Sequence, residues 1–192
     1  MKIKVYLLAL LAGFAVMFLF QYCGQDKCEG IVCLNGGTCE KGICNCKQGF
    51  TGDLCEVEVK PVSIKITKFK VIGWPASNGG TAWDEYDGPD LYVIMKQGTT
   101  QVYKHHKSEY NVPEDKKFEL VPLTDKIPVL DPDKEYTIEL WDDDLDEGKN
   151  DQKLMVTTAF KPYLVNKRFP AVITVKSFLW DLQIELTLQY TW

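Results

Sequence analysis

The carboxylates of this 192-residue chain are unevenly distributed, and their crowding is the clearest sign of chemistry in the sequence. Ten of the 27 acidic residues lie in residues 84–90 and 142–151, where Lys149 is the sole base. Crowded carboxylates repel one another, which destabilises a fold unless a cation binds between them. Calcium takes about six to eight oxygen ligands from Asp-rich loops. The two segments therefore predict a calcium site, with ordinary solvated turns as the alternative.

The second acidic segment begins like an EF-hand calcium loop but does not continue as one. Asp142, Asp144 and Asp146 occupy the first, third and fifth positions of such a loop. Glu147 then stands where that loop requires glycine, and Lys153 stands where it requires a bidentate glutamate. We therefore expect the ligands to come from loops between strands, because both flanks of the segment have strand character.

Six cysteines are packed into residues 28–55 in the order C-x4-C-x5-C-x4-C-x-C-x8-C. So short a segment, with few apolar side chains, cannot bury enough surface to fold without covalent staples. A zinc site is the alternative, but such sites favour C-x2-C pairs with histidine nearby, and this segment contains neither. The spacing therefore predicts disulfides, although six cysteines allow fifteen pairings and spacing alone does not choose among them.

The residues between the cysteines narrow the fold. Asn35-Gly36-Gly37-Thr38 precedes the third cysteine and Gly49-Phe50-Thr51-Gly52 precedes the last, so glycines stand where the chain must turn. The pattern over residues 24–56 closely resembles an epidermal-growth-factor-like (EGF-like) domain. We expect no calcium in this module, because Gly24-Gln25-Asp26-Lys27 lacks the acidic run of the family's calcium-binding members. The resemblance implies the disulfide pairing Cys28–Cys39, Cys33–Cys44 and Cys46–Cys55.

Residues 1–22 have the character of a targeting segment, either a signal peptide or a signal anchor. Lys2 and Lys4 precede an uncharged run from Val5 to Phe20. That run is longer than a usual signal-peptide core and short for a transmembrane helix. Both interpretations export the rest of the chain, in agreement with disulfide formation.

The seventh cysteine, Cys23, begins a short tether at residues 23–27. It stands where a bacterial lipoprotein signal ends in an acylated cysteine, although the preceding residue is normally small and here is Tyr22. Lipidation of Cys23, an uncleaved signal anchor, and secretion with a spare thiol are the three alternatives. The first two predict a membrane-attached protein of lipoprotein type, located outside the cytoplasm or on the cell surface.

Residues 57–60 are expected to be a linker, and residues 61–192 a second domain without cysteine. Apolar and polar residues alternate in this domain, most clearly over 180–192. The alternation of 62–66 shifts phase at 69–71, which predicts a β-bulge near Lys68. The pattern predicts a mainly β fold class, with an eight-stranded antiparallel β-sandwich after the disulfide-rich module. The other strands are expected at 91–96, 101–105, 117–121, 136–140, 154–160 and 171–177.

The acidic segments border these strands in a pattern that resembles a C2 domain, the calcium-dependent phospholipid-binding sandwich. Asp84-x5-Asp90 runs into Leu91-Tyr92-Val93, and Trp141-Asp142-x-Asp144 ends another strand before Asn150-Asp151. One more residue than usual separates Asp144 from Asp151, so the match contains an insertion. The resemblance implies a Ca²⁺ site with the ligands Asp84, Asp90, Asp142, Asp144 and Asp151, and with Asp87, Asp143 and Asp146 as substitutes.

The sequence favours binding over catalysis. The cysteines are assigned to disulfides, no nucleophile or phosphate-loop motif is present, and His105 and His106 are adjacent on a predicted strand, which also argues against zinc. Scattered bases and a net charge of -5 argue against nucleic acid. We therefore predict a non-enzymatic, membrane-attached binding or adhesion protein. Its calcium-dependent C2-like head would engage phospholipid, glycan or protein.

Two other functions are compatible with the same residues. One is a carbohydrate-binding sandwich with structural calcium, in which Trp74 or Trp83 at a loop tip stacks on sugar. Burial of these two tryptophans under the loop is the alternative to an exposed tip. The other is a structural surface module without a ligand. A contact of His105 and His106 with anionic lipid is a further hypothesis, but a polar strand face explains them more simply.

Overall fold

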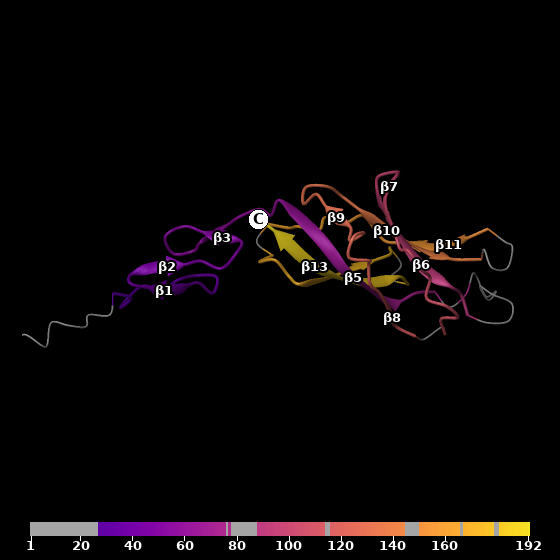
Figure 1. The fold of residues 1–192 in the computed structure, drawn as a ribbon, viewed down its shortest axis with the longest axis horizontal. Helices are drawn as coiled ribbons and strands as arrows, with labels where there is room; N and C mark the ends of the chain where they lie inside the picture. Colours follow the sequence, from indigo (N-terminus) through magenta and orange to yellow (C-terminus); the bar gives the residue numbers. More distant parts are fainter. Residues whose placement is uncertain are drawn as a thin grey trace, which may run out of the picture. The chain divides into compact units, whose positions relative to one another are not determined.

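The computed structural model describes residues 27–75, 77, 88–113, 116–144, 150–165, 167–178 and 181–192. The chain divides into two compact units, Met1–Glu58 and Val59–Trp192. Every regular element of the described residues is a β-strand, and none is a helix, so the mainly β fold class is confirmed (Figure 1). Within the same ranges no helix is long and apolar enough to cross a membrane. The predicted targeting segment, 1–22, and Cys23 lie outside the described residues.

The small unit consists of two short hairpins. β1 (Thr38–Glu40) pairs with β2 (Ile43–Asn45), and the turn between them places Lys41 and Gly42 at φ values of 53° and 87°. Two successive positive φ values are what a tight hairpin turn requires. β3 (Phe50–Thr51) pairs with β4 (Val57–Glu58). Two of the four residues expected to form a linker therefore belong to a strand of this unit.

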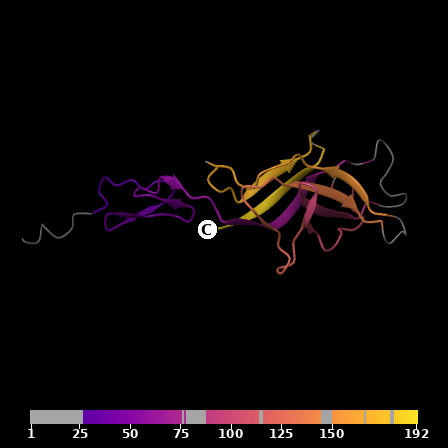
Figure 2. The ribbon, with the colours of Figure 1, turned by 90° about the horizontal axis from the view of Figure 1, so that it is seen from above.

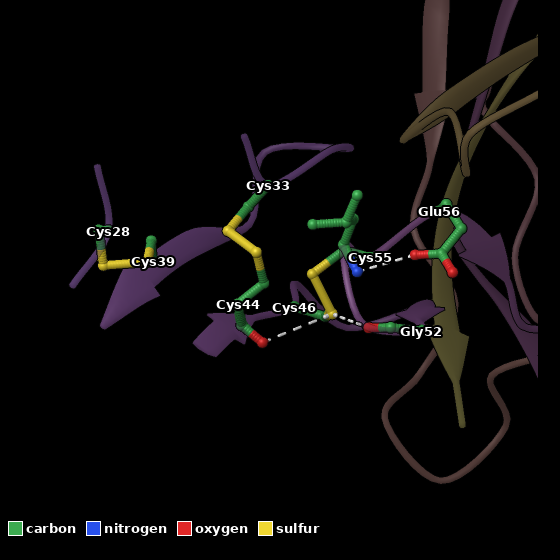
Figure 3. Close-up of a disulfide and its surroundings, with 9 residues drawn as sticks. Cys28, Cys33, Cys39, Cys44, Cys46, Gly52, Cys55 and Glu56 are labelled. Atoms are coloured by element: carbon green, nitrogen blue, oxygen red, sulfur yellow. Dashed lines mark hydrogen bonds between the residues drawn. A yellow bond between two sulfur atoms is a disulfide. The ribbon is translucent and has the colours of Figure 1, made fainter. Parts of the chain in front are cut away.

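Three disulfides hold this unit together, as Figure 3 shows. They join Cys28 to Cys39, Cys33 to Cys44 and Cys46 to Cys55, which is the pairing that the EGF-like resemblance implies. Packing around them is tight, because a Cβ atom on Gly37 would lie 2.8 Å from the sulfur of Cys55. A side chain at this position would therefore displace the third disulfide, which explains the need for glycine.

The large unit is a sandwich of two antiparallel sheets. The four-stranded sheet has the order β11-β10-β6-β7, and the five-stranded sheet has the order β12-β13-β5-β8, with β9 also paired to β5. In Figures 1 and 2, β13 lies along β5, and β10 lies beside β6 and β11. The strands are β5 (Ser63–Gly73), β6 (Leu91–Gln97), β7 (Thr100–Lys104), β8 (Phe118–Leu120), β9 (Val129–Leu130), β10 (Thr137–Asp142), β11 (Gln152–Val156), β12 (Val172–Lys176) and β13 (Gln183–Thr191).

The predicted phase shift in the first strand is a real β-bulge. Thr187 pairs with Lys68 and the next residue, Leu188, pairs with Ile66, so the register shifts at Thr67. The bulge lets Ile66 and Phe69 both face the core although they are three residues apart. β9 is an additional strand beyond the eight expected, and it comprises only two residues.

The core of the sandwich consists entirely of residues from the large unit. The fully buried side chains Phe69, Met95, Leu140 and Leu186 come from both sheets. Leu182, Ile184, Leu186 and Leu188 alternate with more exposed residues, as the period of two predicts. Since this unit contains no cysteine, side-chain packing and strand pairing hold its fold without disulfides.

Candidate functional site

Strand pairing brings the two acidic segments to the same end of the four-stranded sheet. Leu91, the first residue of β6, pairs with Asp142, the last residue of β10, and Asp142 also pairs with Gln152 at the start of β11. Asp90, Asp143 and Asp151 each lie one residue outside these pairs, so they meet where three strands end. The two segments are about 50 residues apart in sequence, and their proximity follows from the sheet.

Backbone and side-chain hydrogen bonds join the two segments. The backbone N–H of Asp90 donates to Asp142 Oδ1 at 2.8 Å, and the N–H of Asp143 donates to the carbonyl oxygen of Asp90 at 2.9 Å. Asp90 Oδ1 also accepts from the N–H of Asn111 at 2.8 Å. Asp142 is fully buried. These contacts fix Asp90 and Asp142 beside each other, as the calcium prediction requires.

Two other carboxylates have buried oxygens with unsatisfied acceptor capacity. Asp144 is only 2% exposed, and its Oδ2 accepts no hydrogen bond from the described residues. Asp151 Oδ1 is in the same situation, whereas its Oδ2 accepts from the hydroxyl of Tyr92 at 2.6 Å. Burying a carboxylate oxygen without a donor or a cation is costly. The two oxygens therefore fit a cation ligand set made only of oxygen.

Tyr92 on β6 and Lys104 on β7 both contact Asp151, which directly precedes β11. Lys104 Nζ lies 3.6 Å from Asp151 Oδ2 and 4.3 Å from the centre of the Tyr92 ring. Burial raises the pKa of Tyr92, and the hydrogen bond to Asp151 and the charges of nearby aspartates raise it further. Tyr92 thus stays protonated and donates to Asp151 across the neutral range. This arrangement fixes one oxygen of Asp151 and leaves Oδ1 for another partner.

The structure tests only part of the predicted ligand set. Asp84, Asp87, Asp146 and Trp83 lie outside the described residues. No three acidic, histidine or cysteine side chains of the described part of the chain cluster closely enough to hold a metal. The substitute Asp143 instead accepts a hydrogen bond from Ser108 through its Oδ2. The described residues therefore do not form a metal site by themselves, and the calcium ligand set stays a prediction.

Sequence reasoning missed the residues that position the aspartates. Ser108 and the backbone of Asn111 come from the segment after β7, where no spacing signal marks them. Tyr92 was visible in the sequence as part of Leu91-Tyr92-Val93, but the contact of its hydroxyl with Asp151 depends on the pairing of β6 with β10. These contacts come from tertiary structure alone.

Of the two positions that the sequence allows for Trp74, a loop tip or burial under the loop, the structure shows burial. Trp74 is 8% exposed, packs in the core, and donates from Nε1 to the carbonyl oxygen of Lys116 at 3.4 Å. The neighbouring Gly, Ser and Asn residues favoured a loop, but an indole gains more free energy from burial than from exposure. A sugar cannot stack on this residue.

His105 is likewise an internal residue. It is 6% exposed, and its ring nitrogens contact the carbonyl oxygens of Lys107 and Val121 at 2.7 and 3.3 Å. Burial lowers the pKa of His105 below its ordinary value, although the two backbone contacts act in the opposite direction. His105 therefore does not present a charge to an anionic surface at neutral pH.

One exposed aromatic residue lies at the end of the five-stranded sheet where β5 leads into the first acidic segment. Gly73, the last residue of β5, pairs with Gln183, so the turn between β12 and β13 is at this end. Phe178 in that turn is 83% exposed. It is the most exposed large apolar side chain of the described residues.

Comparison with known proteins finds sequence similarity over part of the chain. No family model matches the chain. Protein lin-12 of Caenorhabditis elegans is 34% identical over 70 residues, which are 36% of this chain and 5% of that much longer protein. This similarity and the three disulfides fit an EGF-like module, and such a module is typical of extracellular or surface proteins.

Solved structures similar to this chain include C2 domains. One, described as the structure of a C2 domain, has 11% identity and a TM-score of 0.38, and the match covers 68% of this chain and 98% of that one. A C2 domain protein from Ramazzottius varieornatus has 13% identity and a TM-score of 0.39, with 68% and 89% covered. Calcium-bound Extended-Synaptotagmin 2 has 18% identity and a TM-score of 0.34, with 68% and 46% covered.

Proposed function

We propose that this protein is a non-catalytic, extracytoplasmic binding protein whose sandwich binds calcium at the acidic loops and then engages an anionic phospholipid surface. In this proposal the EGF-like module is a disulfide-held spacer, and residues 1–23 attach the chain to a membrane. The observation that supports it most strongly is the pair of buried carboxylate oxygens, Asp144 Oδ2 and Asp151 Oδ1, which accept no hydrogen bond from the described residues.

A bound cation would offset the negative charge of these buried oxygens. Buried carboxylates either become protonated or acquire a counter-charge, and the neighbouring aspartates make the local potential more negative. Asp144 and Asp151 would supply ligands through these oxygens, and the C2-like resemblance adds Asp84, which lies outside the described residues. Bound calcium would supply positive charge that offsets the aspartates and attracts a phosphate group.

A phospholipid surface is the partner that best fits this end of the sandwich. Phe178 is 83% exposed in the turn next to the end of β5, and aromatic rings prefer the interface between lipid headgroups and acyl chains. The burial of Trp74 removes one of the two aromatic residues that a sugar-binding site would use. Both observations favour the membrane partner over carbohydrate.

Sedimentation of the Val59–Trp192 unit with liposomes tests the proposal, since this unit lacks the hydrophobic N-terminus. Millimolar calcium is the fair condition, because extracellular calcium modules bind at about 10⁻⁴–10⁻³ M. We expect co-sedimentation with phosphatidylserine liposomes in calcium, and none in chelator or with purely zwitterionic liposomes. Phe178→Ser should weaken binding, whereas Val62→Ser, which removes a 73% exposed side chain next to β5, should not. Equal liposome binding with calcium and with chelator would contradict the proposal.

A further inference from the structure

A second concavity lies in the sandwich unit, away from the acidic loops, under the connection that joins β11 to β12. Its volume is about 580 Å³, within the range of about 300–1,000 Å³ that is typical of small-molecule sites. Most of its wall is apolar or aromatic, and the principal side chains are Phe160, Tyr163, Leu164, Phe169, Ile173 and Tyr190. It shares no residue with the candidate calcium site.

Strand topology explains why the cavity exists. β11 is the edge of the four-stranded sheet and β12 is the edge of the five-stranded sheet, so residues 157–171 cross from one layer to the other. At one end of this connection, Thr158 donates through both N–H and Oγ1 to the carbonyl oxygen of Lys176, at 2.8 and 3.0 Å. The connection between β11 and β12 is therefore hydrogen-bonded to β12 at this end.

The other end of the connection is held equally firmly. Leu188 N–H donates to the carbonyl oxygen of Ala171 at 2.8 Å. The hydroxyl of Tyr190 donates to the carbonyl oxygen of Pro170 at 2.9 Å. Burial raises the pKa of Tyr190 to about 12, so its hydroxyl remains a donor across the physiological range. The Tyr190 hydroxyl is thus bound to the backbone, and this residue contributes its ring to the wall.

The cavity combines this apolar wall with cationic residues. Lys161 and Lys167 line it, and Arg168, the single arginine of the chain, follows Lys167 directly. All three are exposed, and none forms an ion pair with a carboxylate of the described residues. Residues 152–180 contain five bases and no acid, which makes this the most one-sidedly basic stretch of an otherwise acidic protein.

The backbone near these cations has an uncommon conformation. Arg168 and Phe169 both have φ of +54°, in the left-handed region that bulky L-residues rarely adopt. Such conformations persist where surrounding structure enforces them, and they are frequent at ligand-binding segments. Phe169 stacks on Tyr163 with ring centres 6.0 Å apart and meets Tyr190 edge-on at 5.4 Å. Of these two residues with positive φ, Arg168 is one of the cations and Phe169 forms part of the cavity wall.

We propose that this cavity binds a single-chain fatty acid, with its hydrocarbon chain against the aromatic wall and its carboxylate near Lys161, Lys167 and Arg168. An apolar wall favours a ligand body without polar groups, since any buried polar group would lack a partner. Unpaired cations at the opening favour an anionic head. This site is independent of calcium, because its charge is opposite in sign to that of the acidic loops.

Photolabelling of the full chain with a photoactivatable dodecanoate, in the presence of a calcium chelator, tests the proposal. We expect labelled peptides from residues 159–175 or the peptide containing Tyr190, and loss of labelling when unmodified dodecanoate is added. Ala159→Trp, which places a large ring at a lining position, should abolish labelling while tryptophan fluorescence still reports a folded sandwich. Labelling elsewhere, or labelling that survives Ala159→Trp, would overturn the proposal.

The role of the cations is measured separately by competition with dodecanoate and dodecanol. Lys161→Gln combined with Lys167→Gln should weaken competition by dodecanoate by about three- to tenfold, because exposed charge pairs contribute modestly, and should leave dodecanol unchanged. Lys117→Gln with Lys134→Gln removes the same charge from exposed positions outside the cavity and should change neither. Equal effects of the two double variants would overturn the anionic specificity. Labelling only by vesicle-bound lipid, without competition by free dodecanoate, would overturn the monomer site.

Discussion

At the scale of single residues, most buried charges in the sandwich have identifiable partners. Glu139 in β10 is 5% exposed and lies 3.0 Å from Lys96 Nζ on β6 and 3.4 Å from Lys153 Nζ on β11. Trp141 Nε1 also donates to it at 2.9 Å. Asp144 Oδ2 differs, because it accepts no hydrogen bond from the described residues. The contrast between the two carboxylates distinguishes a structural ion pair from a candidate ligand.

Glu139→Gln should reduce stability in a pH-dependent way. Burial raises the pKa of Glu139, but the hydrogen bonds from Lys96 and Trp141 and the charge of Lys153 outweigh it and hold the pKa below 4.5. A carboxyl with a lowered pKa stabilises the fold above its unfolded value, and this contribution disappears as pH falls through the folded value. We expect a loss of about 1–2 kcal/mol at pH 7 that shrinks below pH 4.5.

Urea unfolding followed by tryptophan fluorescence measures this effect, because all five tryptophans lie in the sandwich unit. Glu135→Gln, at an exposed position close by, is the matched control and should change the free energy of unfolding little. A difference between wild type and Glu139→Gln that is the same at pH 7 and at pH 3 would contradict the ion-pair interpretation.

At the scale of elements, alternation predicted strands well and tertiary contacts poorly. The last strand and the bulge near Lys68 were evident in the sequence, because a period of two and its phase shift are local properties. β9 was not, since Val129 and Leu130 form a strand only by pairing with Lys65 and Ile64. The burial of Trp74 and the cavity under the β11–β12 connection depend on how the two sheets meet, which no local pattern encodes.

Leu186→Ala in β13 should be strongly destabilising. Its side chain is fully buried between the sheets, so truncation leaves a cavity and should cost about 2–5 kcal/mol in the free energy of unfolding. Gln189→Ala, on the opposite and exposed face of the same strand, should change it by less than about 0.5 kcal/mol. Urea midpoints of the two variants measure the difference. Similar losses for both would contradict the assigned faces of the strand.

At the scale of the whole molecule, the two units are stabilised by different kinds of interaction. The small unit depends on three disulfides, each contributing about 2–4 kcal/mol, and the large unit depends on a core without cysteine. The cysteine spacing predicted this division, and the EGF-like resemblance implied the pairing. The proposed phospholipid and fatty-acid sites both belong to the large unit.

Cys46→Ser should disable the small unit and leave the large one folded. Loss of the Cys46–Cys55 disulfide removes the bridge nearest to Gly37, and proteolysis should then cut within residues 27–58. The melting temperature reported by tryptophan fluorescence should stay unchanged, since all tryptophans and the entire core cluster lie beyond residue 58. A fall of several degrees would contradict the independence of the two units.

Calcium-dependent melting of the full chain tests the central claim most directly. A ligand that binds only the folded state stabilises it by about 2.7 kcal/mol at a hundred times its dissociation constant. We predict that millimolar calcium raises the melting temperature by several degrees, and that Asp144→Asn abolishes this rise. The same variant should slightly stabilise the calcium-free protein, because it removes a buried negative charge whose Oδ2 accepts no hydrogen bond from the described residues. A melting temperature that does not change with several millimolar calcium would contradict the account.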